Sequence, residues 1–419
     1  MKITHIHIER FRGFQNEDFE VGSLLTAIAG QNGTQKSTLL GIITQTFTLK
    51  TEDSMRVEKP LCGGSYISAF KDKFRLSPTF DKPKGHEWTI SFDAGMDDFT
   101  VESIKRTGDP NVRFWKKGAR QEGDGYISFP TIFLSLKRLV PVAEEAKIIT
   151  DDTLLTQEEL NEFKQLHNKI LIAQTPISSA TTITSKNKQS IGVSTELYDW
   201  NQNSMGQDNL GKIILALFSF KRLHDKYPQQ YKGGILAIDE MDATMYPASQ
   251  VELLKILRKY ASKLNLQILF TTHSMSLLKA MDDLVQEVTK KEETANQAKI
   301  LYLKKVDDKI AIKQGVNFKG IQLDLNVVAE GNNRKKNRIT AYTEDKENIL
   351  FVKAILKSKA FVLDFVDVTL PCSTLMELVT KRVPAFIYPY SIVILDGDVR
   401  MNKNDLRKIN NADNILILP

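Results

Sequence analysis

The chain has 419 residues, of which 42% are hydrophobic and 26% are charged. These values are ordinary for a soluble globular protein, and the length allows two or three domains. The formal net charge of +6, from 57 basic and 51 acidic residues, permits contact with nucleic acid without establishing it. Cys62 and Cys372 are the only cysteines and lack metal-ligand spacing, which argues against a disulfide framework and a zinc site.

The N-terminal residues give no sign of export or membrane insertion. The first eleven, MKITHIHIERF, alternate like a strand and lack the apolar core of a signal peptide. No apolar run approaches the ~18–20 residues that a membrane-spanning helix requires. We therefore expect a cytoplasmic protein that does not interact with a membrane.

The first motif follows two predicted strands in residues 1–29. The apolar run 24–29 predicts a buried strand, and the segment GQNGTQKST at 30–38 leads into apolar residues at helical spacing. Strand, glycine loop, Lys-Ser and helix are typical of a phosphate-binding loop. In such a loop backbone N–H groups face a phosphate, the lysine reaches the terminal phosphates and the serine ligates Mg²⁺. The expected ATP-binding residues are Gly30, Asn32, Gly33, Thr34, Lys36, Ser37 and Thr38.

One residue departs from the GxxxxGK[ST] pattern, because Gln35 stands where the second glycine is expected. A glycine there allows the backbone to approach phosphate closely, whereas Gln35 places a side chain at this point. We therefore expect slow hydrolysis of ATP. The alternative interpretation of 30–38 is a polar strand-to-helix turn without a ligand.

The middle of the chain mixes short strands with an insert. Residues 50–85 are expected to be irregular, and alternating runs in 88–101 and 111–133 predict an antiparallel β subdomain. Residues 131–136 predict a buried strand. Within 140–200 the pattern predicts one amphipathic helix at 157–173, followed by a mobile Ser/Thr/Lys-rich segment at 175–195.

Further motifs follow in 203–274. The sequence NSMGQ at 203–207 stands before a predicted helix at 210–223, and GILAIDE at 234–240 predicts a buried strand ending in Asp239 and Glu240. Pro247 opens another helix, and a strand at 266–270 ends in TTHS with His273. Alternating strands and helices indicate a mostly parallel sheet with ligands at the carboxyl ends of its strands.

The last quarter predicts a second α/β unit. A basic linker, 326–338, precedes predicted strands at 339–343, 365–370, 391–395 and 415–418, with helices after 344 and at 373–382 and 404–409. Glu344 follows the first strand, and Asp396 and Asp398 follow the third. Such carboxylates can bind Mg²⁺ or Mn²⁺, and two ions so held can cleave a phosphodiester. The alternative is a set of acidic helix caps on an ordinary α/β domain.

The ordered motifs GQNGTQKS, NSMGQ, ILAIDE, DATMYP and TTHS resemble those of ATP-binding-cassette (ABC) ATPase heads of the RecF and SMC type. The resemblance implies that Asp239 holds Mg²⁺ through water, Glu240 orients the attacking water and His273 senses the γ-phosphate. It also implies that Ser204 and Gly206 contact ATP held by an opposite subunit, as in a head-to-head dimer. Asp242 matches a dimer-bridging aspartate, and Arg12 matches an arginine near the nucleotide.

The carboxylates of the last quarter resemble the metal site of a Toprim domain. Glu344 takes the glutamate position and Asp396 and Asp398 its Asp-x-Asp, while Asn348 stands where related nucleases carry an acid, so Glu347 or Asp345 is expected to substitute. An ABC head followed by a Toprim domain is similar to the overcoming-lysogenisation-defect (OLD) family of nucleases over essentially the whole chain.

The OLD resemblance implies an α/β chain with an ABC-type head at 1–325, carrying a dimerisation insert at 140–200, and a Toprim-like unit at 339–419. It implies an ATP- and metal-dependent DNA endonuclease in anti-phage defence, with a partner RNA or protein as in retron systems. The rival hypotheses are a RecF-like repair ATPase and a defence sensor whose last unit only docks partners. The Toprim pattern stops at Pro419 without a late lysine, so either the chain is truncated or the unit is incomplete.

Overall fold

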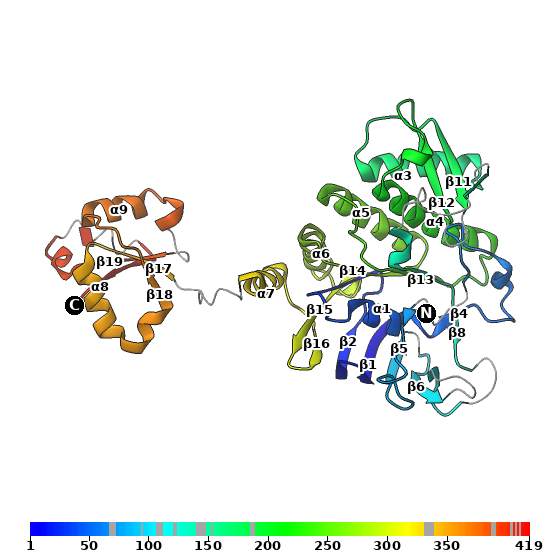
Figure 1. Ribbon diagram of the computed structural model, residues 1–419, viewed down its shortest axis with the longest axis horizontal. Coiled ribbons are helices and arrows are strands. Elements are labelled where there is room, and N and C mark those ends of the chain that lie inside the picture. The colour runs from blue at the N-terminus through cyan, green and yellow to red at the C-terminus, as the bar shows by residue number, and fades with distance from the viewer. Residues whose placement is uncertain are drawn as a thin grey trace. The chain divides into compact units, whose positions relative to one another are not determined.

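The computed structural model describes residues 1–66, 73–93, 95–105, 112–119, 124–139, 148–151, 154–184, 189–330, 339–386, 391–402, 405–406, 409 and 412–419. The chain divides into two compact units, Met1–Leu325 and Asn326–Pro419, and Figure 1 shows the elements of each. Over the described ranges, no helix is long and apolar enough to cross a membrane.

A six-stranded sheet in the order β16-β15-β3-β14-β13-β9 forms the centre of the larger unit. All neighbouring strands pair in parallel except β15 and β16, which are antiparallel. This confirms the predicted mostly parallel sheet and brings the carboxyl ends of β3, β13 and β14 to one edge. The strands are β3 (Leu25–Gly30), β9 (Thr131–Leu134), β13 (Gly234–Ile238), β14 (Leu266–Thr272), β15 (Ala298–Val306) and β16 (Lys309–Lys313).

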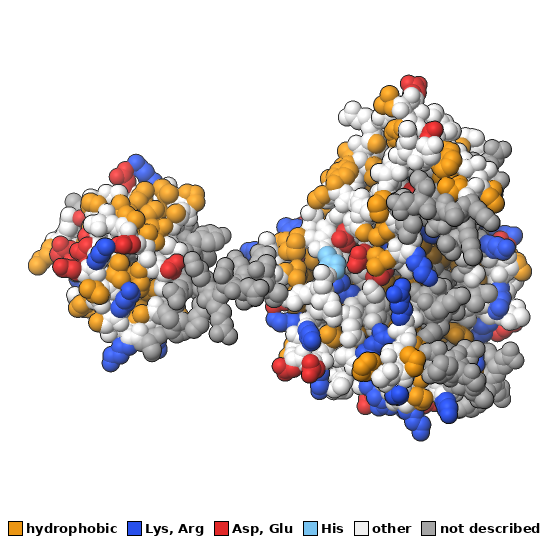
Figure 2. Space-filling view, in the orientation of Figure 1, with side chains coloured by type: hydrophobic (Ala, Val, Ile, Leu, Met, Phe, Trp, Pro, Cys, Tyr) orange, Lys and Arg blue, Asp and Glu red, His pale blue; other side chains and the backbone are white. Residues whose placement is uncertain are grey.

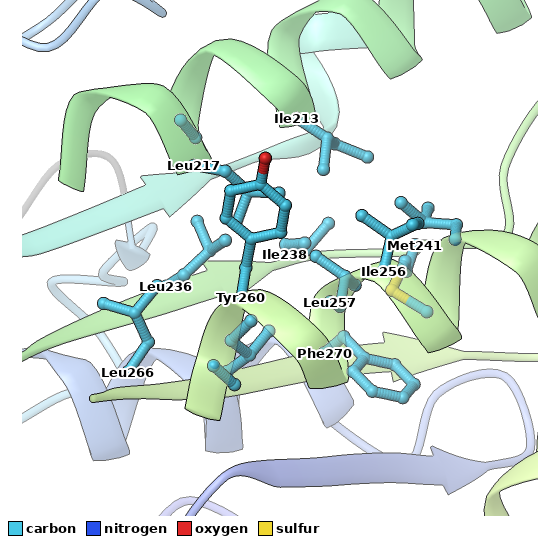
Figure 3. Close-up of a cluster of buried hydrophobic side chains, with 14 of the residues drawn as sticks. Ile213, Leu217, Leu236, Ile238, Met241, Ile256, Leu257, Tyr260, Leu266 and Phe270 are labelled. Carbon is cyan, nitrogen blue, oxygen red and sulfur yellow. The ribbon is translucent and has the colours of Figure 1, made fainter. Parts of the chain in front are cut away.

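Helices cover one face of this sheet (Figure 1). Figure 3 shows apolar side chains of α4 and α5 converging on those of β13 and β14, with Tyr260 and Phe270 among them. Both faces of the sheet are buried, and every residue of β13 and β14 is buried. The apolar runs in these strands are the pattern that predicted them. The covering helices are α4 (Met205–Lys226), α5 (Pro247–Lys263) and α6 (Met275–Val288).

A second sheet, with α1 (Lys36–Thr44), packs on the opposite face. Its five strands pair antiparallel in the order β2-β1-β5-β6-β7, which confirms the predicted antiparallel subdomain. Its strands are β1 (Ile3–Phe11), β2 (Phe14–Glu20), β5 (Glu87–Phe92), β6 (Phe99–Lys105) and β7 (Val112–Lys116). The intervening segment holds η1 (Ser54–Val57) and the short paired strands β4 (Phe47–Thr48) and β8 (Ile127–Ser128).

The insert corrects one prediction. Residues 175–195 were expected to be mobile, but the structure has an antiparallel pair there, β11 (Ser179–Thr184) and β12 (Gln189–Ser194). Threonine and serine suit a pleated strand as well as a loop, and the apolar residues Ala180, Ile183, Ile191 and Val193 of this pair are buried. The pair joins β10 (Ile149–Asp151), beside α3 (Gln157–Leu171), the predicted helix of 157–173.

Two further boundaries differ from the sequence-based expectation. Helix α4 begins at Met205 rather than at 210, because Ser204 and Gln207 form a capping box: Gln207 N–H donates to Ser204 Oγ, and Ser204 N–H donates to the Gln207 side chain. Helix α7 (Phe318–Glu330) continues into the expected linker. Residues 331–338 of the expected basic linker lie outside the described residues.

The smaller unit contains a parallel four-stranded sheet in the order β18-β17-β19-β20. Its strand β18 ends at Phe365, so the predicted strand at 365–370 is wrong beyond its first residue; Val366 makes one more bond to β17 before the chain turns toward Pro371. Of the predicted helix at 404–409, residues 405, 406 and 409 are described and helical, and the other three lie outside the described residues. The elements are β17 (Ile339–Thr343), α8 (Lys346–Leu356), β18 (Leu363–Phe365), α9 (Cys372–Thr380), β19 (Ser391–Leu395) and β20 (Ile415–Ile417).

The larger unit should lose stability in mild acid because of His167 on α3. Its side chain is 2% exposed, and burial lowers its pKa from 6.5 to about 4. The unfolded chain therefore takes up this proton at higher pH than the folded chain, so the free energy of unfolding falls as pH drops from 6.5 toward 4. The full effect is on the order of 3 kcal/mol.

Replacing His167 with phenylalanine removes the titrating group and keeps a ring beside Phe163. We expect the melting temperature of His167→Phe to change less between pH 7 and pH 5 than that of the wild type. His5→Gln, at a partly exposed ring on β1, is the control and should behave as the wild type. Equal acid losses in His167→Phe and wild type would contradict this role of His167.

Candidate functional site

The loop between β3 and α1 has the backbone of a phosphate cradle. Strand β3 ends at Gly30, whose φ is +151°, and a Cβ there would lie 2.4 Å from the carbonyl oxygen of Leu303. Only glycine can make this sharp exit from the strand. Helix α1 then starts at Lys36, so its free N–H groups and dipole face the loop.

Lys36 lies folded over this loop. Its Nζ donates hydrogen bonds to the carbonyl oxygens of Gly30 at 3.1 Å and Gln31 at 3.0 Å. Burial lowers its pKa, while the carboxylates of Glu240 and Asp239 act in the opposite direction. A phosphate would offer this ammonium a stronger, charge-assisted partner than the two carbonyl groups.

Asp239 joins the loop to the neighbouring strands. Its Oδ1 accepts hydrogen bonds from Ser37 Oγ at 2.9 Å and from Thr271 Oγ1 at 2.7 Å. Asp239 follows β13, Thr271 lies in β14, and Ser37 lies in α1 after β3. A hydroxyl and a carboxylate thus stand side by side at the sheet edge, as the oxygen ligands of Mg²⁺ do. The donor set therefore fits this ion.

Glu240 and His273 follow the neighbouring strands β13 and β14, near Asp239. Glu240 has a positive φ of +50°, and its N–H donates to Thr271 Oγ1 at 2.6 Å. His273 follows β14 and is open to solvent on one side. Partial desolvation lowers its pKa, and the positive charge of Lys36 lowers it further, which favours a neutral ring at pH 7.

Ser204 and Gly206 lie at the start of α4. The Ser204 side chain bonds Gln207 and is exposed, and in the described part of the chain it makes no hydrogen bond to the phosphate loop. Gly206 is buried against the loop after β13, where a Cβ would lie 2.6 Å from the carbonyl oxygen of Thr244. The small residue thus lets the start of α4 approach that loop, which also carries Asp242.

Arg12 stands beside the start of α1. Its guanidinium forms a two-point pair with Asp81, both distances being 3.1 Å, and lies 3.5 Å from Thr38 Oγ1. Asp81 is buried and also contacts His86. The structure thereby brings Arg12 beside Thr38 at the end of the phosphate loop.

Gln35 shows why the loop pattern has glycine at this position. Its φ of +62° and ψ of +32° lie in the left-handed region, which glycine adopts at little cost and other residues adopt at about 1 kcal/mol. The sequence-based interpretation attributed the glycine to close approach of phosphate. The backbone turn before α1 is an additional requirement, and Gln35 satisfies it with strain.

Arg138 is a residue of this site that sequence reasoning missed. It lies in η2 (Leu136–Leu139), directly after β9, and is 2% exposed. It contacts Asn209 of α4 and the backbone of Glu240. Its position after a parallel strand of the same sheet was a usable signal, because the other site residues also follow such strands.

In the smaller unit, Glu344 and Asp396 follow the neighbouring parallel strands β17 and β19. Glu344 Oε1 accepts a hydrogen bond from the N–H of Asp396 at 2.9 Å. Burial raises the pKa of Glu344, and the negative charges of Asp398 and Asp396 raise it further. Glu344 and Asp398 line a cavity of about 680 Å³ together with Asp405.

The other acidic candidates of this unit are placed differently. Asp345 is the N-cap of α8 and accepts a hydrogen bond from Asn348 N–H, while Glu347 is exposed. The Asn348 side chain is buried, and its Nδ2 has no hydrogen-bond partner among the described residues. In the part of the unit that is described, no three acidic, histidine or cysteine side chains are close enough to hold a metal ion. The oxygen chemistry fits Mg²⁺ or Mn²⁺, but the carboxylates do not converge.

Comparison with known proteins supports ATP hydrolysis for the larger unit. Residues 135–278 match the family model described as an AAA ATPase domain, and this range includes Asp239, Glu240 and His273. No curated protein matches the chain. The phosphate loop at 30–38 precedes the matched range.

Several solved structures are similar to the chain. The SMC head domain from Thermotoga maritima is 14% identical, covers 75% of this chain and 100% of its own, and has a TM-score of 0.41. The Smc head domain bound to the C-terminal domain of ScpA, from Pyrococcus furiosus, is 12% identical, with 78% and 99% covered and a TM-score of 0.43. The recombination mediator protein RecF is 11% identical, with 75% and 98% covered and a TM-score of 0.38.

Replacing Gln35 with glycine tests the strain in the loop. The change removes the left-handed strain but adds backbone entropy to the unfolded chain, and each effect is about 1 kcal/mol. We therefore expect Gln35→Gly to melt within a few degrees of the wild type and to bind ATP at least as tightly. Gln35→Ala keeps the strain and removes the side chain, so it is the matched control. Weaker ATP binding by Gln35→Gly than by Gln35→Ala would contradict this account.

Proposed function

We propose that the larger unit binds ATP with Mg²⁺ and hydrolyses it. The observation that carries the proposal is the pair of hydrogen bonds from Ser37 and Thr271 to one oxygen of Asp239. These two hydrogen bonds bring together, at one edge of the sheet, the phosphate loop, the carboxylate that would bind Mg²⁺ and the strand before His273. The match of residues 135–278 to an AAA ATPase domain supports the same activity.

Each residue has a role that phosphoryl transfer requires, since this reaction depends on positioning and charge stabilisation. Lys36 and the N–H groups of α1 hold the terminal phosphates. Ser37 and Asp239 would hold Mg²⁺, which when bound neutralises phosphate charge. Glu240 orients the attacking water, and the neutral ring of His273 donates a hydrogen bond to the γ-phosphate.

We further propose that a second copy of the chain completes the site. Ser204 lies exposed at the start of α4, and within the described residues its side chain bonds only to Gln207. Two exposed apolar residues belong to the same region: Met205, the first residue of α4, is 41% exposed, and Tyr246, directly before α5, is 48% exposed. Two heads facing each other would bury these side chains and bring Ser204 and Gly206 to ATP held by the opposite copy.

Lys36→Ala should abolish ATP binding, because it removes the charge that faces the terminal phosphates. Glu240→Gln should still bind ATP and hydrolyse it at least 100-fold more slowly, an order-of-magnitude loss for a positioned base. Equilibrium binding of radiolabelled ATP and phosphate release measure the two effects. Lys279→Ala, at an exposed ion pair on α6, is the control. Wild-type ATP binding by Lys36→Ala would refute the phosphate-loop assignment.

For the smaller unit we propose a Toprim-like, metal-dependent DNA endonuclease site of the OLD type, acting in anti-phage defence. Its support is the placement of Glu344 and Asp396 after neighbouring parallel strands, with Asp398 beside the same cavity. The negative charges of Asp398 and Asp396 are one cause of the raised pKa of Glu344, and a bound divalent cation would relieve the repulsion among these carboxylates. The partners under this proposal are DNA and a defence-system RNA or protein.

A second candidate function is a docking module without nuclease activity. It is favoured by the arrangement of the acids: in the described residues no cation site is formed, Asp345 caps α8 and Asn348 stands where an acid was expected. In that case the protein is an ATPase that binds DNA or a partner, as a RecF-like repair protein or a defence sensor would.

Plasmid nicking separates these two functions. With Mn²⁺ and ATP present, the wild type should nick supercoiled plasmid, and Asp396→Asn should lose this activity while keeping its ATPase rate. The physical reason is the loss of a charged ligand with the backbone unchanged. Asp364→Asn, at an exposed carboxylate on β18 of the same unit, is the matched control. Equal nicking by wild type and Asp396→Asn would favour the docking module.

A further inference from the structure

Arg138 is the most completely satisfied buried cation among the described residues of the ATP site. Its Nε donates to Asn209 Oδ1 at 2.7 Å, and its two terminal nitrogens donate to the carbonyl oxygens of Leu134, Ser135 and Glu240 at 3.2, 3.1 and 2.8 Å. Its hydrogen-bond partners are therefore neutral groups. Burial lowers its pKa to about 10, so the guanidinium remains charged at neutral pH.

A buried charge is unfavourable unless hydrogen bonds and opposite charges offset the loss of water, and here the carboxylates of Asp239, Glu240 and Asp242 favour the charged form of Arg138. Its four hydrogen bonds to neutral groups indicate further, structural reasons for this residue. One reason is the backbone of Glu240. That residue has a φ of +50°, a strained conformation for a side chain other than glycine. Three hydrogen bonds hold it: its N–H donates to Thr271 Oγ1, and its carbonyl oxygen accepts from Arg138 and from the N–H of Ala243. This fixed backbone sets the direction of the Cα–Cβ bond from which the Glu240 carboxylate extends.

The second reason is the connection to α4. Asn209 lies in the second turn of this helix, five positions after Ser204. Its Oδ1 accepts from Arg138, and its Nδ2 donates to the carbonyl oxygen of Ala243 at 3.0 Å. Arg138 and Asn209 therefore tie the start of α4 to both ends of the segment that runs from Glu240 to Ala243.

We infer that Arg138 is a positioning residue that aims Glu240 and couples its orientation to α4. The inference rests on the proposed ATPase function. When the start of α4 engages ATP held by a second copy, any shift of the helix acts on Asn209, and through Arg138 on the carbonyl group of Glu240. Hydrolysis in one copy is thereby made dependent on engagement of the other.

Arg138→Met tests the positioning role, because methionine fills much of the volume but donates no hydrogen bond. Misplacing a catalytic group by about 1 Å can cost roughly 100-fold in rate. We expect a kcat loss of that order, with the equilibrium affinity for ATP within about threefold of wild type. Arg258→Met, at an ion pair on α5 with exposed Glu287, is the control and should retain kcat.

A double-mutant cycle distinguishes positioning from a general structural role. If Arg138 acts through Glu240, then Arg138→Met should cause little further loss in a Glu240→Gln background. If Arg138→Met lowers kcat by the same factor in the wild-type and Glu240→Gln backgrounds, the inference is overturned. Loss of ATP binding by a folded Arg138→Met protein would also overturn it.

A second variant, Asn209→Ala, and a comparison of the wild type with Glu240→Gln complete the test. If Arg138→Met does not fold, Asn209→Ala removes one bond of the same connection and should show the same kcat loss and the same cycle; an unchanged kcat would overturn the inference. Failure of the proposed function is visible separately, because the wild type would then release no phosphate above Glu240→Gln.

Discussion

One carboxylate oxygen holds the proposed ATP site together. Oδ1 of Asp239 accepts a hydrogen bond from α1 through Ser37 and another from β14 through Thr271. Thr271 also accepts from the N–H of Glu240, so the same short network fixes the backbone of the proposed water-orienting residue. Because the parallel strands β3, β14 and β13 end at a common edge, these contacts follow from the sheet order.

Much of this arrangement could be predicted from the sequence, because the buried, mainly apolar strands β3, β13 and β14 are followed by distinctive polar residues. Prediction from residue propensity was wrong where the same residue types suit different structures. The serines and threonines of β11 and β12 predicted a mobile loop, but they form paired strands. Arg138 could not be found from a motif. Its role depends on tertiary contacts with Asn209 and Glu240, residues far from it in sequence.

The smaller unit shows the limits of motif transfer. The order of strands and acids placed Glu344 beside Asp396, as expected for neighbouring parallel strands. Sequence could not show that Asp345 is used by the helix terminus, where a side-chain oxygen satisfies the free N–H of Asn348. The two acids expected to replace the one missing at Asn348 thus differ in availability, since Glu347 is exposed and Asp345 caps α8.

The central claim is that two copies of the chain build each ATP site, and the rate of phosphate release per chain tests it directly. Measured over a wide range of protein concentration, with the oligomeric state followed by sedimentation in the same buffer, this rate should rise as dimers form and level off when dimerisation is complete. A rate per chain that stays constant while the protein sediments as a monomer would contradict the account.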